Sequence, residues 1–447
     1  MGLRFGTDGV RGVANRDLTP ELVLALGRAA ARVLGGDRFV VGRDTRLSGP
    51  LVQAALSAGL ASEGAAVVDL GVVPTPTVAF ASAAEACPGA VISASHNPFG
   101  DNGVKLFAAG GRKLDDAVEA ALEAELDRLL GGVGSALVPA GAAVGRFEAA
   151  GRVVADYEDH LAASLEGRGL EGLRVVVDCA NGAGSHIAPR VLAALGAEVE
   201  ALSDAPDGVN INDGCGSTFP AALQRAVVAA GADAGLALDG DADRVLAVDH
   251  LGALVDGDQV LALCAVDLRS RGRLRDDTVV ATVMANLGFR RAMVAAGVKV
   301  EETVVGDRYV LEALEQGGWS LGGEQSGHVI FADLATTGDG ILTGLQLLDV
   351  VSRSGRRLAE LAAAAMDRMP QVLRNVAVPA GNVEDVMARL RPSVEAAEAE
   401  LGEAGRILVR PSGTEPLVRV MVEAATEELA ESTAMRVAAE AERLSQP

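Results

Sequence analysis

Residues 174–182 read RVVVDCANG, a short apolar run that ends in a polar, glycine-containing loop. The run predicts a buried strand at 174–178, followed by a helix that continues to about Gly196 and a second strand at 198–200. Buried strands that alternate with helices in this way indicate βαβ units in mixed or parallel sheets. This stretch therefore assigns the chain to the α/β class.

The same strand–loop–helix–strand unit occurs twice more, once on each side of this example. The second and third copies start about 100 residues apart, which is the size of a domain. The flanking copies have strands at 38–41 and 65–69 and at 278–282 and 298–300, with loops at 42–46 and near 286–288.

The C-terminal part of the chain differs in kind. Strands are expected at 406–410 and 417–422, and a polar, alanine-rich helix follows from about Glu427. This pattern is typical of a small α+β domain. We therefore expect three similar α/β domains with mixed sheets and a smaller C-terminal α+β domain, with boundaries at 1–150, 151–252, 253–366 and 367–447.

Composition limits the classes of partner. The 447 residues carry a formal net charge of −22, which disfavours nucleic acid and anionic membranes. No apolar run of about 18 residues predicts a membrane span, and no signal pattern opens the chain. We expect a cytoplasmic protein whose four scattered cysteines are free thiols. These are Cys87, Cys179, Cys215 and Cys264.

The stretch SASHNP at 93–98 follows an expected buried strand at 89–92. The Asn-Pro pair forces a turn, so Ser95 is presented at the open end of a strand. That position suits a reactive hydroxyl. Small polar residues also fill ordinary strand-to-helix turns, and this alternative stays open on the stretch alone.

The stretch DGDADR at 239–244 follows the apolar run 235–238. Its three alternate carboxylates can converge on a hard cation such as Mg²⁺. An EF-hand is excluded, because its sixth position would be Arg244 rather than glycine and its twelfth His250 rather than glutamate. A solvated acidic turn is disfavoured, because three crowded carboxylates repel one another without a cation.

The stretch GGEQSGH at 322–328 is dense in hydrogen-bonding side chains. In an extended loop Glu324 and Ser326 would point the same way and could bind sugar hydroxyls or an amine. His328 could move a proton near neutral pH. A structural turn is an equally good interpretation of these residues alone.

The stretch RPSGTEP at 410–416, with Arg419 beyond it, resembles a phosphate cradle because it combines guanidinium groups, hydroxyls and a glycine. A local cradle of this kind would let an acidic protein bind an anion, and a plain β-turn is the alternative. The chain has no Gly-Lys pair for a Walker A loop and no Gly-x-Ser-x-Gly for a serine hydrolase.

The four stretches occur in this order along the chain, and together they resemble the α-D-phosphohexomutase superfamily. The resemblance runs from residue 3 to about residue 424. Within the superfamily, FGTDGVRG at 5–12, ISASHNPF at 92–99 and Gln325 resemble the bacterial phosphoglucosamine mutases.

The resemblance implies four domains around a central cleft and a phosphate on Ser95. It implies one Mg²⁺ per chain, held by Asp239, Asp241, Asp243 and the phosphoserine. Sugar hydroxyls would be bound by Glu324 and Ser326, and the non-reacting phosphate by Arg410, Ser412, Gly413, Thr414 and Arg419. Proton transfer or phosphate stabilisation would fall to Arg11, Lys105, Arg244 and His328.

The implied reaction interconverts glucosamine 6-phosphate and glucosamine 1-phosphate without ATP, for UDP-N-acetylglucosamine and cell-wall synthesis. PhosphoSer95 would give its phosphoryl group to the sugar, and the glucosamine 1,6-bisphosphate intermediate would turn over and return the other phosphoryl group. We expect a phosphosugar as the small-molecule partner, with no nucleic acid or membrane, and leave a homodimer open.

Three other interpretations remain at this stage. The first is a phosphomannomutase or phosphoglucomutase of the same superfamily. The second is a metal-dependent phosphatase in which Ser95 only orients the substrate, and the third is a non-catalytic phosphosugar-binding regulator.

Overall fold

The computed structural model describes residues 9–132, 138–379, 381–411 and 417–445. The chain divides into two compact units. Unit 1 contains residues 1–284 and 298–365, and unit 2 contains residues 285–297 and 366–447. No helix of the described residues is long and apolar enough to cross a membrane. All four cysteines are buried free thiols, as the sequence predicts.

The first sheet of unit 1 is mixed, with the strand order β1-β5-β4-β2-β3-β7 and β6 paired to β5. Strands β4, β2, β3 and β7 run parallel, whereas β5 is antiparallel to its neighbours. The strands are β1 (Val10–Val13), β2 (Arg38–Arg43), β3 (Ala66–Val72), β4 (Gly89–Ile92), β5 (Asp101–Ala108), β6 (Arg112–Lys113) and β7 (Phe147–Ala149).

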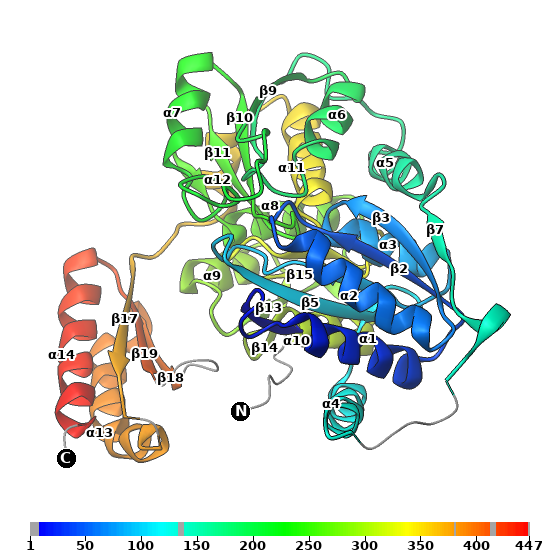
Figure 1. Cartoon of the computed structure of the whole chain (residues 1–447). Coiled ribbons are helices and arrows are strands. Elements are labelled where there is room, and N and C mark those ends of the chain that lie inside the picture. Colours follow the sequence, from blue (N-terminus) through cyan, green and yellow to red (C-terminus); the bar gives the residue numbers. More distant parts are fainter. Residues whose placement is uncertain (1–8, 133–137, 380, 412–416, 446–447) are drawn as a thin grey trace. The chain divides into compact units, whose positions relative to one another are not determined.

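Helices cover both faces of this sheet (Figure 1). Phe39 and Val41 of β2 pack in one core cluster with α1, α2 and α4, whereas Val40 packs in another with α3. The alternation follows from the two-residue period of a strand, which sends successive side chains to opposite faces. The helices are α1 (Pro20–Leu34), α2 (Gly49–Ser62), α3 (Thr75–Ala84) and α4 (Asp116–Leu130).

The second sheet has the strand order β12-β11-β10-β8-β9. Strands β10, β8 and β9 are parallel, and β11 and β12 complete the sheet in antiparallel pairs. Its elements are α5 (Val153–Ala163), β8 (Arg174–Asp178), α6 (Ile187–Ala194), β9 (Glu198–Leu202), α7 (Ala221–Ala230), β10 (Ala234–Leu238), β11 (Val245–Asp249) and β12 (Leu254–Val255).

The third sheet has the strand order β14-β13-β15-β16, with β16 antiparallel and the other strands parallel. Its elements are α8 (Gly257–Ser270), β13 (Thr278–Thr282), α9 (Leu287–Ala295), β14 (Lys299–Thr303), α10 (Asp307–Gly317), β15 (Leu321–Gly323), β16 (Val329–Phe331), α11 (Gly340–Ser354) and α12 (Leu358–Ala365). Of these, α9 belongs to unit 2.

A single strand order recurs in all three sheets. When the strands β2 to β5, β8 to β11 and β13 to β16 are each counted from one to four, each set is arranged 2-1-3-4, with the fourth strand antiparallel. The parallel pairs β2–β3, β8–β9 and β13–β14 confirm the three units predicted from the sequence. An intervening helix gives the chain the crossover that parallel strands need.

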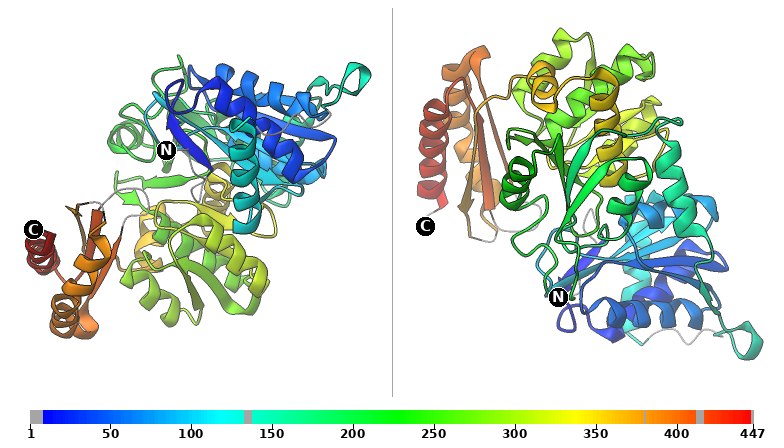
Figure 2. Two further views of the ribbon diagram at one scale, coloured as in Figure 1. Left: turned by 60° about the horizontal axis from the view of Figure 1, so that its bottom comes forward. Right: turned by 90° about the horizontal axis from the view of Figure 1, so that it is seen from above.

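Unit 2 is built on an antiparallel sheet with the order β17-β19-β18, which confirms the expected α+β character. Figure 2 shows α13 and α14 on one face of this sheet, where they share a single apolar core with its strands. The elements are β17 (Gln371–Ala377), α13 (Val383–Leu401), β18 (Arg406–Pro411), β19 (Leu417–Glu423) and α14 (Glu427–Ser445).

Candidate active site

Three of the stretches singled out in the sequence occupy the same place in the shared topology. Residues 93–100 connect β4 to β5, residues 239–244 connect β10 to β11, and residues 324–328 connect β15 to β16. Each is therefore the turn between the third and fourth strands of its sheet. The third strand is parallel to its neighbour in every case, so each turn lies at the carboxyl edge of parallel strands, where α/β proteins bind ligands.

Ser95 is buried, and its backbone φ is +51°, in the left-handed region that few non-glycine residues adopt. Its hydroxyl donates a hydrogen bond to Oδ2 of Asp239 at 2.6 Å. The serine stretch of the first sheet and the aspartate stretch of the second are thus in direct contact. The sequence predicted both stretches as site residues, and the structure brings them together.

The three aspartates form one cluster. Asp239, Asp241 and Asp243 are all buried, and each offers a carboxylate oxygen within 4.8 Å of the others. Oδ1 of Asp241 and Oδ1 of Asp243 are buried without a hydrogen-bond partner. Unpartnered buried carboxylate oxygens are costly, and a bound cation would satisfy them. This donor set, oxygen only, fits a hard divalent cation such as Mg²⁺.

Two helix starts hold the aspartate stretch. Thr75, the first residue of α3, donates through its backbone N to the carbonyl O of Asp241 at 2.9 Å and through its hydroxyl to Oδ2 of Asp241 at 2.7 Å. Gly340, the first residue of α11, donates to the carbonyl O of Ala242 at 3.0 Å. The starts of α3 and α11, which are far apart in the sequence, therefore both hold the stretch that carries the carboxylates.

Basic side chains surround the cluster. Nζ of Lys105, on β5, lies 2.8 Å from Oδ2 of Asp241 and 3.2 Å from Oδ2 of Asp243. Burial opposes the ionisation of Asp243, but Lys105, His328 and Arg244 outweigh it and hold the pKa of Asp243 well below its usual range. Burial, together with the two neighbouring aspartates, holds the pKa of Asp239 well above its usual range.

Arg11 and Arg244 both reach the serine stretch. Nη1 of Arg11 donates to the carbonyl O of Ala94 at 3.4 Å, and the Arg244 side chain approaches the ring of His96. Nδ1 of His96 lies 3.2 Å from Oγ of Ser95. Burial, Arg244 and Arg11 lower the pKa of His96 to about 4. The candidate set from the sequence omitted His96, although its position directly after Ser95 was a signal.

His328 is buried beside the cluster. Its Nε2 accepts a hydrogen bond from the backbone N of Gly338 at 3.0 Å, so Nδ1 faces Oδ1 of Asp243 at 3.8 Å. Burial alone would lower the pKa of His328, but Asp243 and Asp307 outweigh it and raise the pKa. His328 therefore lies beside Asp243, a contact that the sequence did not predict.

The stretch 324–328 is a tight turn, which is one of the two interpretations that its residues left open. The backbone N of Gly327 donates to the carbonyl O of Glu324 at 2.9 Å, because β15 and β16 form a hairpin. Gly327 has a φ of +91°, which closes the turn. Glu324 and Ser326 still lie on the same side, with Oγ of Ser326 3.5 Å from Oε2 of Glu324. Their side chains are half-buried and exposed, respectively.

The candidate phosphate cradle belongs to unit 2. Arg410 of β18 and Arg419 of β19 are direct cross-strand partners at the base of the hairpin. Directly opposed residues share a face of the sheet, so both arginine side chains project from the same face. Ser412, Gly413 and Thr414 fall outside the described residues.

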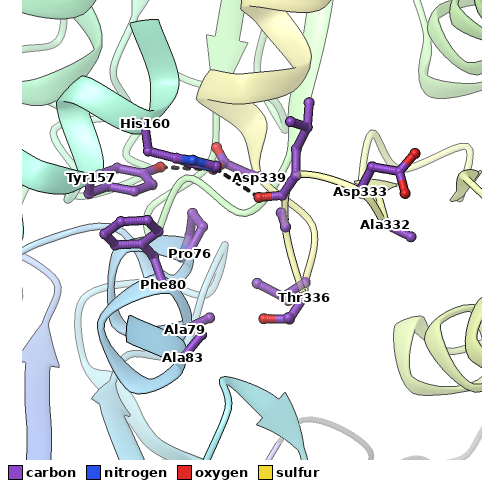
Figure 3. A pocket seen from close by; sticks show the side chains of 13 residues that line it. Pro76, Ala79, Phe80, Ala83, Tyr157, His160, Ala332, Asp333, Thr336 and Asp339 are labelled. Atoms are coloured by element: carbon purple, nitrogen blue, oxygen red, sulfur yellow. Dashed lines mark hydrogen bonds between the residues drawn. The ribbon is translucent and has the colours of Figure 1, made fainter. Parts of the chain in front are cut away.

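A separate cavity of about 200 Å³ is lined by residues of α3, α5 and the segment 332–339 (Figure 3). Phe80, Tyr157 and His160 line one side, and Tyr157 donates to Oδ2 of Asp339 at 2.9 Å. Burial raises the pKa of Asp339 to about 6. No lysine or arginine is among the described residues that line this cavity, so it lacks the charge to bind a phosphosugar.

Comparison with known proteins decides the family. Phosphoglucomutase/phosphomannomutase α/β/α domains I, II and III match residues 2–130, 155–252 and 256–369, and the C-terminal domain of that family matches residues 355–440. A phosphoglucosamine mutase of Frankia alni is 56% identical over 97% of each chain, and one of Salinispora arenicola is 54% identical over 98% of each. The chain belongs to the phosphoglucosamine mutase family.

Solved structures agree with this membership. A phosphoglucomutase/phosphomannomutase family protein of Burkholderia thailandensis superposes with a TM-score of 0.81, 26% identity and coverage of 98% of this chain and 97% of that one. An Aspergillus fumigatus N-acetylphosphoglucosamine mutase, in complex with GlcNAc-6P and magnesium, has a TM-score of 0.71 at 21% identity, with coverage of 100% and 96%, and supports the fold. The phosphoglucosamine mutase family and the expected fold class are thus confirmed.

Proposed function

We propose that this member of the phosphoglucosamine mutase family uses Ser95 as a phosphoryl carrier to interconvert glucosamine 6-phosphate and glucosamine 1-phosphate. The observation that carries the proposal is the 2.6 Å contact between Oγ of Ser95 and Asp239 in a cluster of three buried carboxylates. A hydroxyl in that place can present a phosphate to a cation held by the same cluster. The product would enter UDP-N-acetylglucosamine and cell-wall synthesis in the cytoplasm.

Asp239, Asp241 and Asp243 would hold one Mg²⁺, with an oxygen of phosphoSer95 as a further ligand. The ion would offset negative charge on the transferring phosphoryl group. The unpartnered oxygens of Asp241 and Asp243 support this assignment, because the protein itself leaves them unsatisfied.

The chain's own groups would do the rest of the work by position and charge. Lys105, Arg244 and Arg11 would stabilise the phosphoryl oxygens, and His328 would hold or move a proton at the sugar hydroxyl. His96, with its lowered pKa, would stay neutral beside Ser95.

The sugar would be bound by Glu324 and Ser326, whose side chains lie on one side of their turn. The phosphate that does not react would be bound by the cradle of Arg410, Ser412, Gly413, Thr414 and Arg419. Because glucosamine 1,6-bisphosphate must present either end to Ser95, this cradle would serve both orientations.

The test is a coupled assay that compares glucosamine, glucose and mannose 6-phosphates with Mg²⁺ and a trace of bisphosphate. We expect the highest kcat/KM with glucosamine 6-phosphate. A preference for mannose or glucose 6-phosphate would instead identify a phosphomannomutase or phosphoglucomutase, the alternative of the same superfamily.

Intact mass spectrometry tests the role of Ser95. We expect one phosphoryl group on the wild-type chain and none on Ser95→Ala, which should also lose activity. Ser185→Ala is the matched control, because Ser185 is also buried in a loop but bonds only to the carbonyl O of Gly182. Release of free phosphate without isomerisation would indicate a phosphatase, and no turnover of any hexose phosphate would indicate a binding protein.

A further inference from the structure

Arg46 is an arginine whose side chain is completely buried, which is rare for an isolated charge. It lies in the loop after β2, and its five N–H groups are all used. Nε donates to Oδ2 of Asp44 at 2.9 Å. Nη2 donates to the carbonyl oxygens of Ser95 at 3.0 Å and Asn97 at 2.8 Å. Nη1 donates to the carbonyl oxygens of Asp101, at 3.0 Å, and Pro98.

Four of these five acceptors are therefore backbone carbonyls of one short segment, residues 95–101. That segment is the turn between β4 and β5 that carries Ser95. A guanidinium has a rigid planar fork of five donors, which can fix several carbonyls at once. A lysine ammonium has three donors on a flexible stem and cannot reproduce the pattern.

Asp44 extends the same network to the other side of Ser95. Its Oδ2 accepts a hydrogen bond from the hydroxyl of Ser93 at 2.6 Å. The Ser93 hydroxyl oxygen in turn accepts from the backbone N of Ser95 at 2.9 Å. Both the N–H and the C=O of Ser95 are thus connected to the Arg46–Asp44 pair, one directly and one through Ser93.

Ser95 needs such support because its backbone is in the left-handed region, with a φ of +51°. A non-glycine residue persists there only when its surroundings fix it. Asn212 contributes as well, donating to the carbonyl O of Ser95 at 2.9 Å. Oγ of Ser95 meets Asp239 only while this backbone conformation is kept.

We propose that Arg46, acting through Asp44 and Ser93, is the positioning residue that holds Ser95 in line for phosphoryl transfer. The inference rests on the proposed carrier role of Ser95. It assigns a role to residues outside the aspartate stretch at 239–244, the stretch at 322–328 and the candidate phosphate cradle at 410–416. Arg46 does not touch the reacting atoms. It acts through the backbone of the serine turn.

The experiment compares Arg46→Lys with the wild type and with Arg168→Lys, a matched control. Arg168 also makes a forked contact with a buried carboxylate, at 2.8 Å and 3.1 Å to Asp349, but bonds to no residue of the serine turn. For each variant kcat, KM for glucosamine 6-phosphate and Tm are measured. A displacement of about 1 Å at a reacting group costs about 100-fold in rate.

We therefore expect Arg46→Lys to lower kcat by about 100-fold with little change in KM, whereas Arg168→Lys lowers Tm and keeps kcat. In Arg46→Ala, added guanidinium ion should restore part of kcat, because it refills the vacated donor site. The ³¹P resonance of phosphoSer95 should shift in Arg46→Lys and not in Arg168→Lys.

A folded Arg46→Lys enzyme with kcat within about 3-fold of wild type would overturn the inference, because less than 1 kcal/mol of barrier would then depend on the fork. If Arg46 variants do not fold, Ser93→Ala supplies the test. It removes only the link between Asp44 and the Ser95 N–H, so an unchanged kcat would overturn the inference equally. An inactive wild type would refute the proposed function instead. Failure of the proposed function is therefore distinguishable from failure of the inference about Arg46.

Discussion

The hydroxyl of Thr75 offers a sharp test of the proposed metal site. The change Thr75→Val keeps the shape of the side chain and removes only the donor to Oδ2 of Asp241 at 2.7 Å. The backbone bond from residue 75 to the Asp241 carbonyl survives, so the stretch should stay in place. The variant thus isolates one hydrogen bond to one carboxylate.

The size of the effect follows from burial and charge. Both Thr75 and Asp241 are buried, so water cannot replace the lost donor, and Lys105 is left as the other bonding partner of that oxygen. A hydrogen bond to a charged group contributes about 1.5–3 kcal/mol. Loss of a group that orients a metal ligand typically weakens metal binding by about 10- to 100-fold.

Isothermal titration of the phosphorylated protein with Mg²⁺ measures the change, with the Mg²⁺ dependence of kcat as a second readout. Thr77→Val is the control, since Thr77 is equally buried two residues along α3 and its hydroxyl does not bond to the aspartates. Thr75→Val should weaken Mg²⁺ binding by at least about 10-fold and Thr77→Val should not. Equal Mg²⁺ affinities for the two variants would refute the assignment of Asp241 as a metal ligand.

Three further predictions concern charge. Burial raises the pKa of Asp339 from 3.8 to about 6, so the folded chain binds more protons than the unfolded chain in that range and stability falls as pH rises through it. Asp339→Asn should reduce the fall in Tm between pH 4 and pH 6.5. An unchanged dependence of Tm on pH would contradict a raised pKa for Asp339. Glu423→Gln should destabilise unit 2 by about 1.5–3 kcal/mol in chemical denaturation, because the buried Glu423 loses its charge-assisted hydrogen bonds to the half-buried Arg406. Glu400→Gln, at an exposed ion pair, should change little. Lys105→Met should lower Tm without Mg²⁺ and enlarge the rise in Tm when Mg²⁺ is added, because Asp241 and Asp243 then lose the ammonium group that pairs with both. An equal rise in Tm for the variant and the wild type would argue against a shared charge cluster.

The local pattern predicted the strands well. The expected strands 89–92, 174–178 and 278–282 coincide with β4, β8 and β13. Each is a short apolar run closed by polar or glycine residues, so its ends can be identified from neighbouring residues alone. The three parallel pairs followed from the helices between them.

Contacts between distant residues could not be predicted in the same way. Thr75 and Asp241 are 166 positions apart, and Arg46 and Ser95 are 49 apart. No local period connects such pairs, because the fold alone brings them together. The roles of Thr75 and Arg46 therefore emerged only from the structure.

The stretch at 324–328 left two interpretations open, an extended loop and a structural turn, and the structure contains the turn for a local reason. The sequence offered Gly323 and Gly327 at either end, and the antiparallel pairing of β15 with β16 makes them the close of a hairpin. Similarly, the loop expected near 286–288 is already helical, because Asn286 caps α9 by accepting from the backbone N of Gly288. In both cases pairing or capping set the backbone conformation of the stretch.

The repeated position of the three turns has an evolutionary consequence. The serine, aspartate and glutamate turns each close a separate sheet, and a backbone hydrogen bond from N of Val245 to the carbonyl O of Gly327, at 3.1 Å, joins strand β11 to the glutamate turn. Under the proposed function, substitutions in the β15–β16 turn would alter the choice of sugar while the strands that present Ser95 and the aspartates stay unchanged. New substrate preferences would then arise by drift in one turn, with the proposed phosphoryl-transfer chemistry inherited intact.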